Sequence, residues 1–241
     1  MVTAAPQHAP LEPGFVLHTR PYRESSLLVE AFAQASGRIA LVARGARRPK
    51  SPYRGLLTPF RPLLLAWRGR GDLATLTSAE PEHGAAALSG AALLNGLYLN
   101  ELLMRVLHRH DSHPELYADY ANALRELGSR APAEPVLRKF ELRLMQAIGY
   151  GLVLDHDYRS GDLLQPTGRY HYVPEHGPTR ERQTPAVEIS GLTLAALRAE
   201  CFDDPTTLRE AKRLMRFLLA HHLGDKPLKS RELFRSKRAM D

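Results

Sequence analysis

The fold is decided by five short apolar runs: FVLHT at 15–19, LLVEAF at 27–32, IALV at 39–42, PLLLAW at 62–67 and LATLTS at 73–78. Each has the length of a β-strand, and turn signals such as Gly37 and Gly69-Arg70-Gly71 separate them. A five-stranded barrel that carries basic loops is most simply an OB-fold. We therefore predict an OB-fold domain over residues 1–82, with residues 1–13 as a mobile tail.

Amphipathic helices are predicted after residue 83. In the first, within 88–109, apolar residues recur every four positions: Leu94, Tyr98, Leu102 and Val106. A second helix is predicted over 114–127, and a third begins near Pro132 or Pro135 and stops at Gly149. Further helices are expected at 192–201 and after Asp204-Pro205, where Asp suits the cap and Pro the first turn. The fold class is therefore α+β.

The helical part is interrupted by residues 151–190, where Gly, Pro and polar residues dominate. Only Tyr170 to Val173 is strand-like, which leaves room for a small hairpin. We therefore expect a central helical domain at 83–150 and an irregular insertion at 151–190. The C-terminal helices at 191–241 would complete the helical domain and end in a basic tail.

The charge of the chain is concentrated at its two ends. The net charge is +7, and residues 1–80 hold 11 Lys/Arg against 5 Asp/Glu, whereas residues 205–241 hold 10 against 4. The middle, 81–204, holds 12 against 17 and is acidic. Two basic ends indicate a polyanionic partner, nucleic acid above all, although a basic protein without such a partner is the alternative.

The sequence also suggests the compartment. No apolar run approaches 18 residues, and the N-terminus has neither the basic nor the apolar region of a signal peptide. Cys201 is the only cysteine, so no disulfide can form within the chain. We expect a cytoplasmic protein that associates with the nucleoid and not with a membrane.

The most informative stretch is 38–71, which contains nine basic residues and no acidic one. Its densest part, 44–50, lacks apolar periodicity and is predicted to be a flexible loop that follows a phosphate backbone without reading bases. The DNA-binding residues predicted here are Arg38, Arg44, Arg47, Arg48, Lys50, Arg54 and Arg70. The alternative is a solvated surface loop.

Three aromatic residues near this stretch could stack on bases. Phe60 and Trp67 lie in or beside apolar runs, so core packing is favoured for both. Tyr53 lies among Arg and Pro residues and is the better candidate for stacking.

A second basic surface is predicted on the helix after Pro205. Its cations fall at i, i+3, i+4 and i+7, opposite a stripe of apolar residues. The predicted DNA-binding residues of this helix and of the tail are Arg209, Lys212, Arg213, Arg216, Lys229 and Arg231. An ordinary solvated helix face is the alternative interpretation.

Catalytic signatures are mostly missing. The sequence has no P-loop motif and no G-x-S-x-G elbow, and Cys201 lies on an amphipathic helix where core packing is favoured over a nucleophilic role. Asp155, Asp157 and Asp162 could hold Mg²⁺ as in a nuclease. The histidines 156, 171 and 176 could bind zinc, although structural zinc sites mostly use cysteine. We predict no enzyme activity, no cofactor and no metal.

Several segments together resemble the RecO family of recombination mediators. They are FVLHTRP at 15–21 followed by ESSL at 24–27, LVARGAR at 41–47, PFRPLLL at 59–65, GLYLNELL at 96–103, LRKFE at 137–141, GYG at 149–151 and KPLKSREL at 226–233. They occur in the expected order over about residues 14 to 235.

This resemblance implies an N-terminal OB-fold, a helical bundle and a zinc-finger-like insertion. It implies binding of single- and double-stranded DNA and annealing of complementary strands. The implied partners are RecR, the acidic C-terminal tail of single-stranded DNA-binding protein (SSB), and indirectly RecF and RecA, which is loaded onto SSB-coated strands. Many members carry four zinc-binding cysteines in the insertion. This sequence has none there and resembles the proteobacterial branch without the metal.

The resemblance also suggests where the SSB tail would bind. That tail is acidic and ends in an apolar residue, so its receptor needs an apolar groove beside cations. Arg138 and Lys139, beside Phe140, offer this chemistry, and Arg143 follows one turn later. Ordinary surface charges are the alternative. Two rival functions stay open, a metal-dependent nuclease at Asp155 and Asp157 and an adaptor whose basic ends bind RNA.

Overall fold

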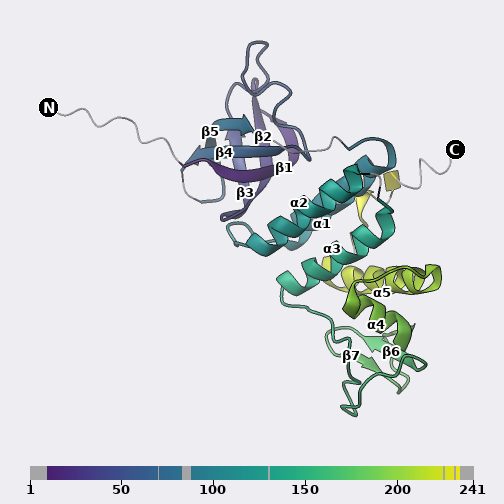
Figure 1. Ribbon diagram of the computed structural model, residues 1–241. Helices are drawn as coiled ribbons and strands as arrows, with labels where there is room; N and C mark the ends of the chain where they lie inside the picture. Colours follow the sequence, from purple (N-terminus) through teal and green to yellow (C-terminus); the bar gives the residue numbers. More distant parts are fainter. Residues whose placement is uncertain are drawn as a thin grey trace. The chain divides into compact units, whose positions relative to one another are not determined.

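The computed structural model describes residues 10–69, 71–82, 88–129, 131–224, 226–230, 232 and 233. They form two compact units (Figure 1). The first unit contains a β-barrel, two helices and the residues that follow Leu228. The second runs from Ala131 to Leu228. The predicted segment 83–150 is thus divided, with its first two helices in one unit and its third in the other.

The N-terminal barrel is closed and consists of five strands. They are β1 (Glu12–Tyr22), β2 (Ser26–Ala33), β3 (Gly37–Ala43), β4 (Pro62–Arg68) and β5 (Ala74–Pro81). The strand order is β1-β2-β3-β5-β4, and β1 pairs with β4 to close the barrel. All pairs are antiparallel except β3 with β5. All five predicted strands and the OB-like barrel are confirmed.

The barrel interior is filled by small and branched apolar side chains. Alternate residues of each strand face inward, as the two-residue period of a strand requires. The fully or nearly buried interior comprises Val16, Val29, Ala31, Ala33, Ile39, Leu41, Ala43, Leu63, Leu65, Ala74 and Leu76. Ala46 and Leu57, from the segment between β3 and β4, join the same cluster.

The outward-facing residues of β1 and β2 are also buried, because α2 packs against them. Phe15 and Phe32 meet Tyr117 and Tyr120, with ring centroids 5.2 Å apart for Phe15–Tyr120 and 5.6 Å apart for Phe32–Tyr117. This two-sided burial explains why consecutive residues, and not only alternate ones, are buried in both strands. Burial raises the pKa of the Tyr120 hydroxyl well above its ordinary value.

The helices α1 (Gly90–Val106) and α2 (Pro114–Gly128) complete the first unit. A buried amide links them to the barrel. The Asn100 Nδ2 donates to the backbone oxygen of Leu17 at 2.8 Å, and its Oδ1 accepts a hydrogen bond from the Tyr120 hydroxyl. Asn100 and Tyr120 are 1 % and 0 % exposed, so neither group could be satisfied by water instead.

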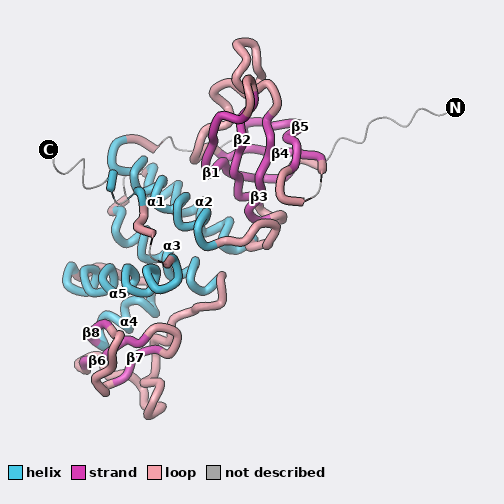
Figure 2. Tube along the Cα trace, turned by 180° about the vertical axis from the view of Figure 1, so that it is seen from behind, coloured by secondary structure: helices cyan, strands magenta, loops and turns pink. Residues whose placement is uncertain are grey.

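The second unit combines three helices with a small sheet. Its helices are α3 (Ala133–Ala147), α4 (Gly191–Ala199) and α5 (Pro205–Leu223), close to the predicted positions. The sheet, seen with α4 and α5 in Figure 2, has the order β7-β6-β8 with β6 (Arg169–Val173), β7 (Gly177–Thr179) and β8 (Val187–Ser190). The insertion is therefore more regular than predicted. The hairpin of β6 and β7 is present, but β8 was missed because it is four residues long and contains a charged residue.

No helix in the described part of the chain has the length and apolar character needed to cross a bilayer.

We predict that Asn100→Ala lowers the free energy of unfolding by about 2–4 kcal/mol, because it removes the buried donor to the Leu17 carbonyl and the buried acceptor of the Tyr120 hydroxyl. Tyr120→Phe, which removes one hydroxyl, should cost about 1–2 kcal/mol. Urea denaturation would measure both. Asn122→Ala on the exposed face of α2 is the control and should change stability by less than about 0.5 kcal/mol. If the Asn100 and Asn122 variants lose the same amount of stability, the hydrogen bonds of Asn100 to Leu17 and Tyr120 do not stabilise the unit.

Candidate nucleic-acid interface

The basic segment between β3 and β4 is folded into consecutive turns. Backbone bonds of 3.0–3.2 Å join Arg48 N to Gly45 O, Ser51 N to Arg48 O, and Arg54 N to Ser51 O. Ala46 and Leu57 anchor the segment in the barrel core. The segment 44–50, predicted to be a flexible loop, is therefore part of a longer turn-rich connection that two buried apolar side chains fix to the barrel. We call residues 44–57 the basic loop.

Five predicted DNA-binding residues lie exposed on the basic loop: Arg44, Arg47, Arg48, Lys50 and Arg54. Arg47 and Arg54 donate to the backbone oxygens of Glu24 and Pro49, at 3.2 and 3.4 Å. Within the part of the chain that the structure describes, none of the five forms an ion pair with a carboxylate. Their positive charge is thus available to an external anion.

Arg38 lies at the other end of β3 and has a structural role that the sequence did not indicate. Its guanidinium pairs with Glu30 at 3.2 Å and donates to the oxygens of Met104 and Leu107 at the end of α1. Cations are favourable at this end of a helix, where carbonyl groups lack partners. Arg109 pairs with the same Glu30 carboxylate at 2.6 Å. The predicted residue Arg70 lies outside the described residues.

The three aromatic candidates for base stacking all pack on the protein itself. Phe60 is buried, and its ring lies close against Gly96 of α1. Trp67 and Tyr53 are partly buried against the barrel core. The Tyr53 hydroxyl donates to the Thr77 oxygen at 3.2 Å, and burial raises its pKa.

The predicted cationic face of α5 is partly occupied. Lys212 pairs with Glu134 of α3, and Arg213 donates to the backbone oxygen of Glu188. Arg209 and Arg216 are exposed, and Arg209 donates to the Thr206 hydroxyl at 3.1 Å. The helix therefore offers fewer unpaired cations than the basic loop.

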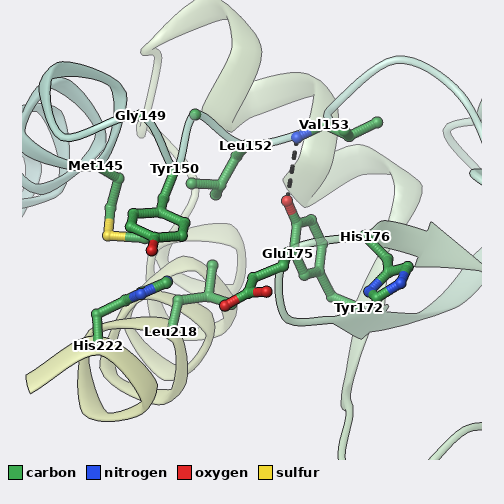
Figure 3. A pocket seen from close by; sticks show the side chains of 11 residues that line it. Met145, Gly149, Tyr150, Leu152, Val153, Tyr172, Glu175, His176, Leu218 and His222 are labelled. Atoms are coloured by element: carbon green, nitrogen blue, oxygen red, sulfur yellow. Dashed lines mark hydrogen bonds between the residues drawn. The ribbon is translucent and has the colours of Figure 1, made fainter. Parts of the chain in front are cut away.

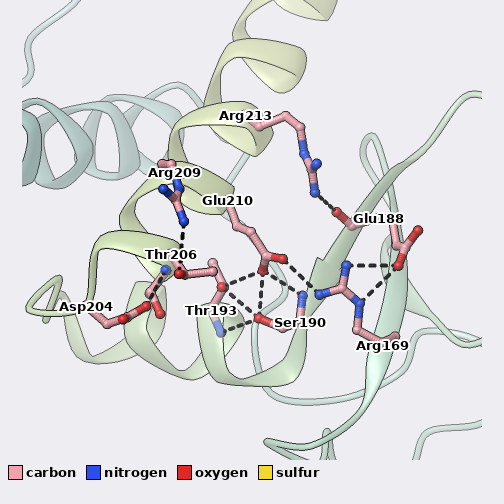
Figure 4. Close-up of polar contacts among 10 residues, drawn as sticks. Arg169, Glu188, Ser190, Thr193, Asp204, Thr206, Arg209, Glu210 and Arg213 are labelled. Carbon is pink, nitrogen blue, oxygen red and sulfur yellow. Dashed lines mark hydrogen bonds and ion pairs between the residues drawn. The ribbon is translucent and has the colours of Figure 1, made fainter.

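A polar network around Glu210 holds α5 to β8 and α4 (Figure 4). Its Oε2 accepts from the Ser190 and Thr193 hydroxyls, both at 2.7 Å, and its Oε1 pairs with Arg169 at 2.8 Å. Burial alone would raise the pKa of Glu210. The bonds from Ser190, Thr193 and Arg169 stabilise the charged form more strongly and lower the pKa to about 2.

The predicted SSB-tail residues on α3 differ in exposure. Arg138 is only 3 % exposed and pairs with Glu141, which is itself buried. Lys139 is half-buried, and Arg143 is exposed and pairs with Glu200 at 2.6 Å. The structure therefore keeps Lys139 and Arg143 accessible and places Arg138 inside the unit.

The acidic residues of the insertion have structural partners. Asp157 is 5 % exposed, and its oxygens accept hydrogen bonds from the backbone N–H groups of Arg159, Ser160 and Arg180. Burial acts to raise the pKa of Asp157, but these donors outweigh it and the net shift is downward. Asp155 pairs with the neighbouring His156 at 2.7 Å. Among the described residues, no three His, Cys, Asp or Glu side chains gather as metal ligands would.

A cavity of about 250 Å³ lies in the second unit (Figure 3). Its lining includes Tyr150, whose ring lies 4.0 Å from that of His222, and Tyr172, whose hydroxyl accepts from Val153 N. Burial and the neighbouring His221 lower the pKa of His222. Glu175 also lines the cavity, so its carboxylate disfavours an acidic ligand there.

The prediction that Cys201 packs in the core is wrong. The side chain is exposed, and its Sγ donates to Asp203 Oδ2 at 2.9 Å. The hydrogen bond to the Asp203 carboxylate stabilises the protonated thiol and raises its pKa, and the negative charge of Asp203 acts in the same direction.

The chain returns to the first unit at its C-terminal end. The Glu101 carboxylate on α1 accepts hydrogen bonds from the N–H groups of Lys229 and Ser230, both at 2.9 Å, and from the Ser230 hydroxyl at 2.6 Å. Lys229 keeps an exposed side chain, whereas Arg231 lies outside the described residues.

Comparison with known proteins identifies the family. The family described as "Recombination protein O N terminal" matches residues 11–85, and "Recombination protein O C terminal" matches residues 88–232. The chain belongs to the RecO family. The first match covers the barrel and the second covers both helical regions, so the family is shown for nearly the whole chain.

Individual RecO relatives align along nearly their full length. DNA repair protein RecO of Nitrosospira multiformis is 49 % identical over 95 % of this chain and 96 % of its own. Those of Azoarcus sp. and Methylococcus capsulatus are 46 % and 47 % identical, over 95 % and 96 % of this chain and 97 % and 95 % of their own. These relatives support a role in DNA repair and recombination.

We predict that Glu210→Gln destabilises the second unit by about 1–3 kcal/mol at pH 7, because the hydrogen bonds to a charged acceptor are removed. The folded pKa of about 2 lies below the ordinary 4.5, so the stabilisation is complete above pH 4.5 and is lost as the pH falls toward 2. Thermal unfolding of the wild type and of Glu210→Gln across this pH range should show that the difference in stability between the two proteins becomes smaller as the pH falls. Glu188→Gln, on the exposed partner of the same Arg169, is the control. If the difference in stability does not depend on pH, the charge of Glu210 is not the cause of that difference.

Proposed function

We propose that this RecO protein binds single- and double-stranded DNA through the basic loop and anneals complementary strands. The observation that carries the proposal is the group of five exposed cations on consecutive turns, without a carboxylate partner in the described structure. A turn-rich loop places charges along a curved path and offers few flat surfaces for reading bases. Binding is therefore electrostatic and independent of sequence.

Annealing follows from charge neutralisation. Two single strands repel each other through their phosphates, and a surface that neutralises phosphates on both reduces this repulsion. Arg209, Arg213 and Arg216 on α5, together with Lys229, supply additional positive charge for the second strand. No covalent bond is made or broken, so no catalytic residue is required.

Membership of the RecO family also suggests which other proteins act together with this one in recombination. We propose that it acts with RecR, and indirectly RecF, to load RecA onto single strands coated by SSB, and that it works in the cytoplasm on the nucleoid. Its contact with the acidic SSB tail would use Lys139 and Arg143, the two accessible cations of the predicted set on α3. Arg138 would instead support α3 from within.

The rival functions are less well supported. A nuclease at Asp155 and Asp157 would need carboxylates directed at a metal, whereas Asp157 is buried and bonded to backbone N–H groups. An RNA-binding adaptor would use the same phosphate chemistry as the proposed DNA binding. Competition between DNA and RNA oligonucleotides of equal length distinguishes a DNA-binding protein from an RNA-binding adaptor, because each would bind its own nucleic acid more tightly.

We predict that a variant with alanine on the basic loop binds DNA of every sequence more weakly and with a shallower salt dependence. For each phosphate of a single strand that the variant no longer neutralises, the slope of log K against log salt should become shallower by about 0.7. Fluorescence anisotropy at several salt concentrations measures this. The substituted residues are Arg44, Arg47, Arg48 and Lys50.

A charge-matched variant controls for net charge. It replaces four exposed arginines outside the proposed surfaces: Arg125, Arg180, Arg182 and Arg198. The control should keep the wild-type slope and the wild-type rate in an annealing assay with SSB-coated complementary strands. If both variants flatten the slope equally, binding depends on overall charge and not on the basic loop.

We also predict that Lys139→Glu combined with Arg143→Glu weakens binding of a peptide with the SSB tail sequence by about tenfold or more, because like charges then face each other. Isothermal calorimetry measures the affinity. Arg209→Glu on α5 is the control and should leave peptide binding unchanged while weakening DNA binding. Unchanged peptide affinity in the double variant would remove this face of α3 as the binding site.

A further inference from the structure

The turn between β1 and β2 carries an aromatic residue and a cation stacked on each other. The Arg23 guanidinium carbon lies 5.3 Å from the centroid of the Tyr22 ring. Tyr22 is half-buried, Arg23 is exposed, and neither was among the residues predicted to bind DNA. Arg23 has a φ of 51°, which a tight turn requires and which is unusual for a residue other than glycine.

This turn is joined directly to the basic loop. The backbone N–H of Arg47 donates to the oxygen of Ser25 at 2.9 Å, and its guanidinium donates to the oxygen of Glu24 at 3.2 Å. The two segments therefore form one continuous surface at the same end of the barrel.

The strand register gives the scale of this surface. Pro21 pairs with Leu27, and Leu27 pairs with Ala43, so the residues that precede Tyr22 and Arg44 are two strands apart. Two strand spacings are about 10 Å, roughly the rise of three stacked nucleotides. A strand that lies along the basic loop can thus bring a base to Tyr22.

The other aromatic residues of the described barrel are already occupied. Phe15 and Phe32 pack under α2. Tyr53 and Trp67 lie against the barrel core, and Phe60 is buried. Tyr53 is also partly exposed and lies within the basic loop, but it packs against the barrel core and its hydroxyl donates to the Thr77 oxygen. Tyr22, by contrast, is partly exposed and has the Arg23 guanidinium beside its ring.

We infer that Tyr22 and Arg23 form a stacking platform for an unpaired base of a nucleic-acid strand whose phosphates follow the basic loop. The inference rests on the proposed function and adds to it a preference for unpaired strands. Aromatic rings and guanidinium planes both stack on bases, and such stacking tolerates any base. In a duplex the bases are stacked on each other inside the helix, so the platform contributes only to single strands.

The test compares an oligo(dT) strand with an abasic strand of the same length, which keeps the phosphates and lacks the bases. Tyr22→Leu should weaken binding of oligo(dT) by about 5- to 150-fold, the range for the loss of one stacked base. Binding of the abasic strand should change by less than about twofold. Tyr22→Phe, which keeps the ring, should bind both strands like the wild type and shows that the position tolerates substitution.

A matched control comes from the second unit, where Arg159 lies 5.8 Å from the ring centroid of Tyr158 but pairs with Glu181. Tyr158→Leu should leave both affinities unchanged. A direct readout uses Tyr22→Trp, because Trp67 is the only tryptophan of the chain. The added fluorescence should be quenched by oligo(dT) and not by the abasic strand.

The outcomes separate the proposed function from the stacking platform. If the wild type binds neither strand, the proposed function fails. If the wild type binds both strands and the alanine variant of the basic loop loses both, while Tyr22→Leu changes neither or weakens both equally, the stacking platform alone is overturned.

Discussion

The first unit depends on one buried amide. Asn100 holds the backbone of β1 with one atom and the hydroxyl of Tyr120 with another, and thereby joins barrel, α1 and α2. Because α2 covers the outer side of β1 and β2, that part of the barrel wall is unavailable to a ligand. The surface proposed for nucleic acid lies elsewhere, at the end of the barrel where the β1–β2 turn and the basic loop meet.

The positively charged side chains of this protein fall into two groups. One group is paired within the protein, and the other has no carboxylate partner in the described chain. Arg38, Arg109 and Lys212 neutralise carboxylates or helix carbonyls and connect elements within a unit. Arg138 neutralises the buried Glu141 within α3 itself. The cations of the basic loop neutralise no carboxylate within the described chain. A count of all basic residues therefore overestimates the positive charge that is available to an external anion, because some of it is neutralised within the protein.

This difference also shows how far the sequence could predict the structure. The five strands followed from apolar runs and turn residues, because both signals are local. The structural role of Arg38 could not be predicted from the local sequence, because its acceptors Met104 and Leu107 lie 66 and 69 residues away. The burial of Arg138 had a local signal in the sequence, because Glu141 follows one helical turn later and can pair with it. The contact between Tyr22 and Arg23 also had a local signal, because the two residues are adjacent at a turn.

Carboxylates organise the connections around the insertion, which contains no cysteine. Asp157 gathers three backbone N–H groups, and Glu210 gathers two hydroxyls and a guanidinium, so each acts as a centre around which loops close. The Glu101 carboxylate does the same for residues 229 and 230, with a different result. Because these residues follow the whole second unit in the chain, a ribosome must synthesise that unit before the first one can receive its last contact. During translation the Glu101 carboxylate on α1 therefore lacks these donors until the second unit and residues 229 and 230 have been synthesised.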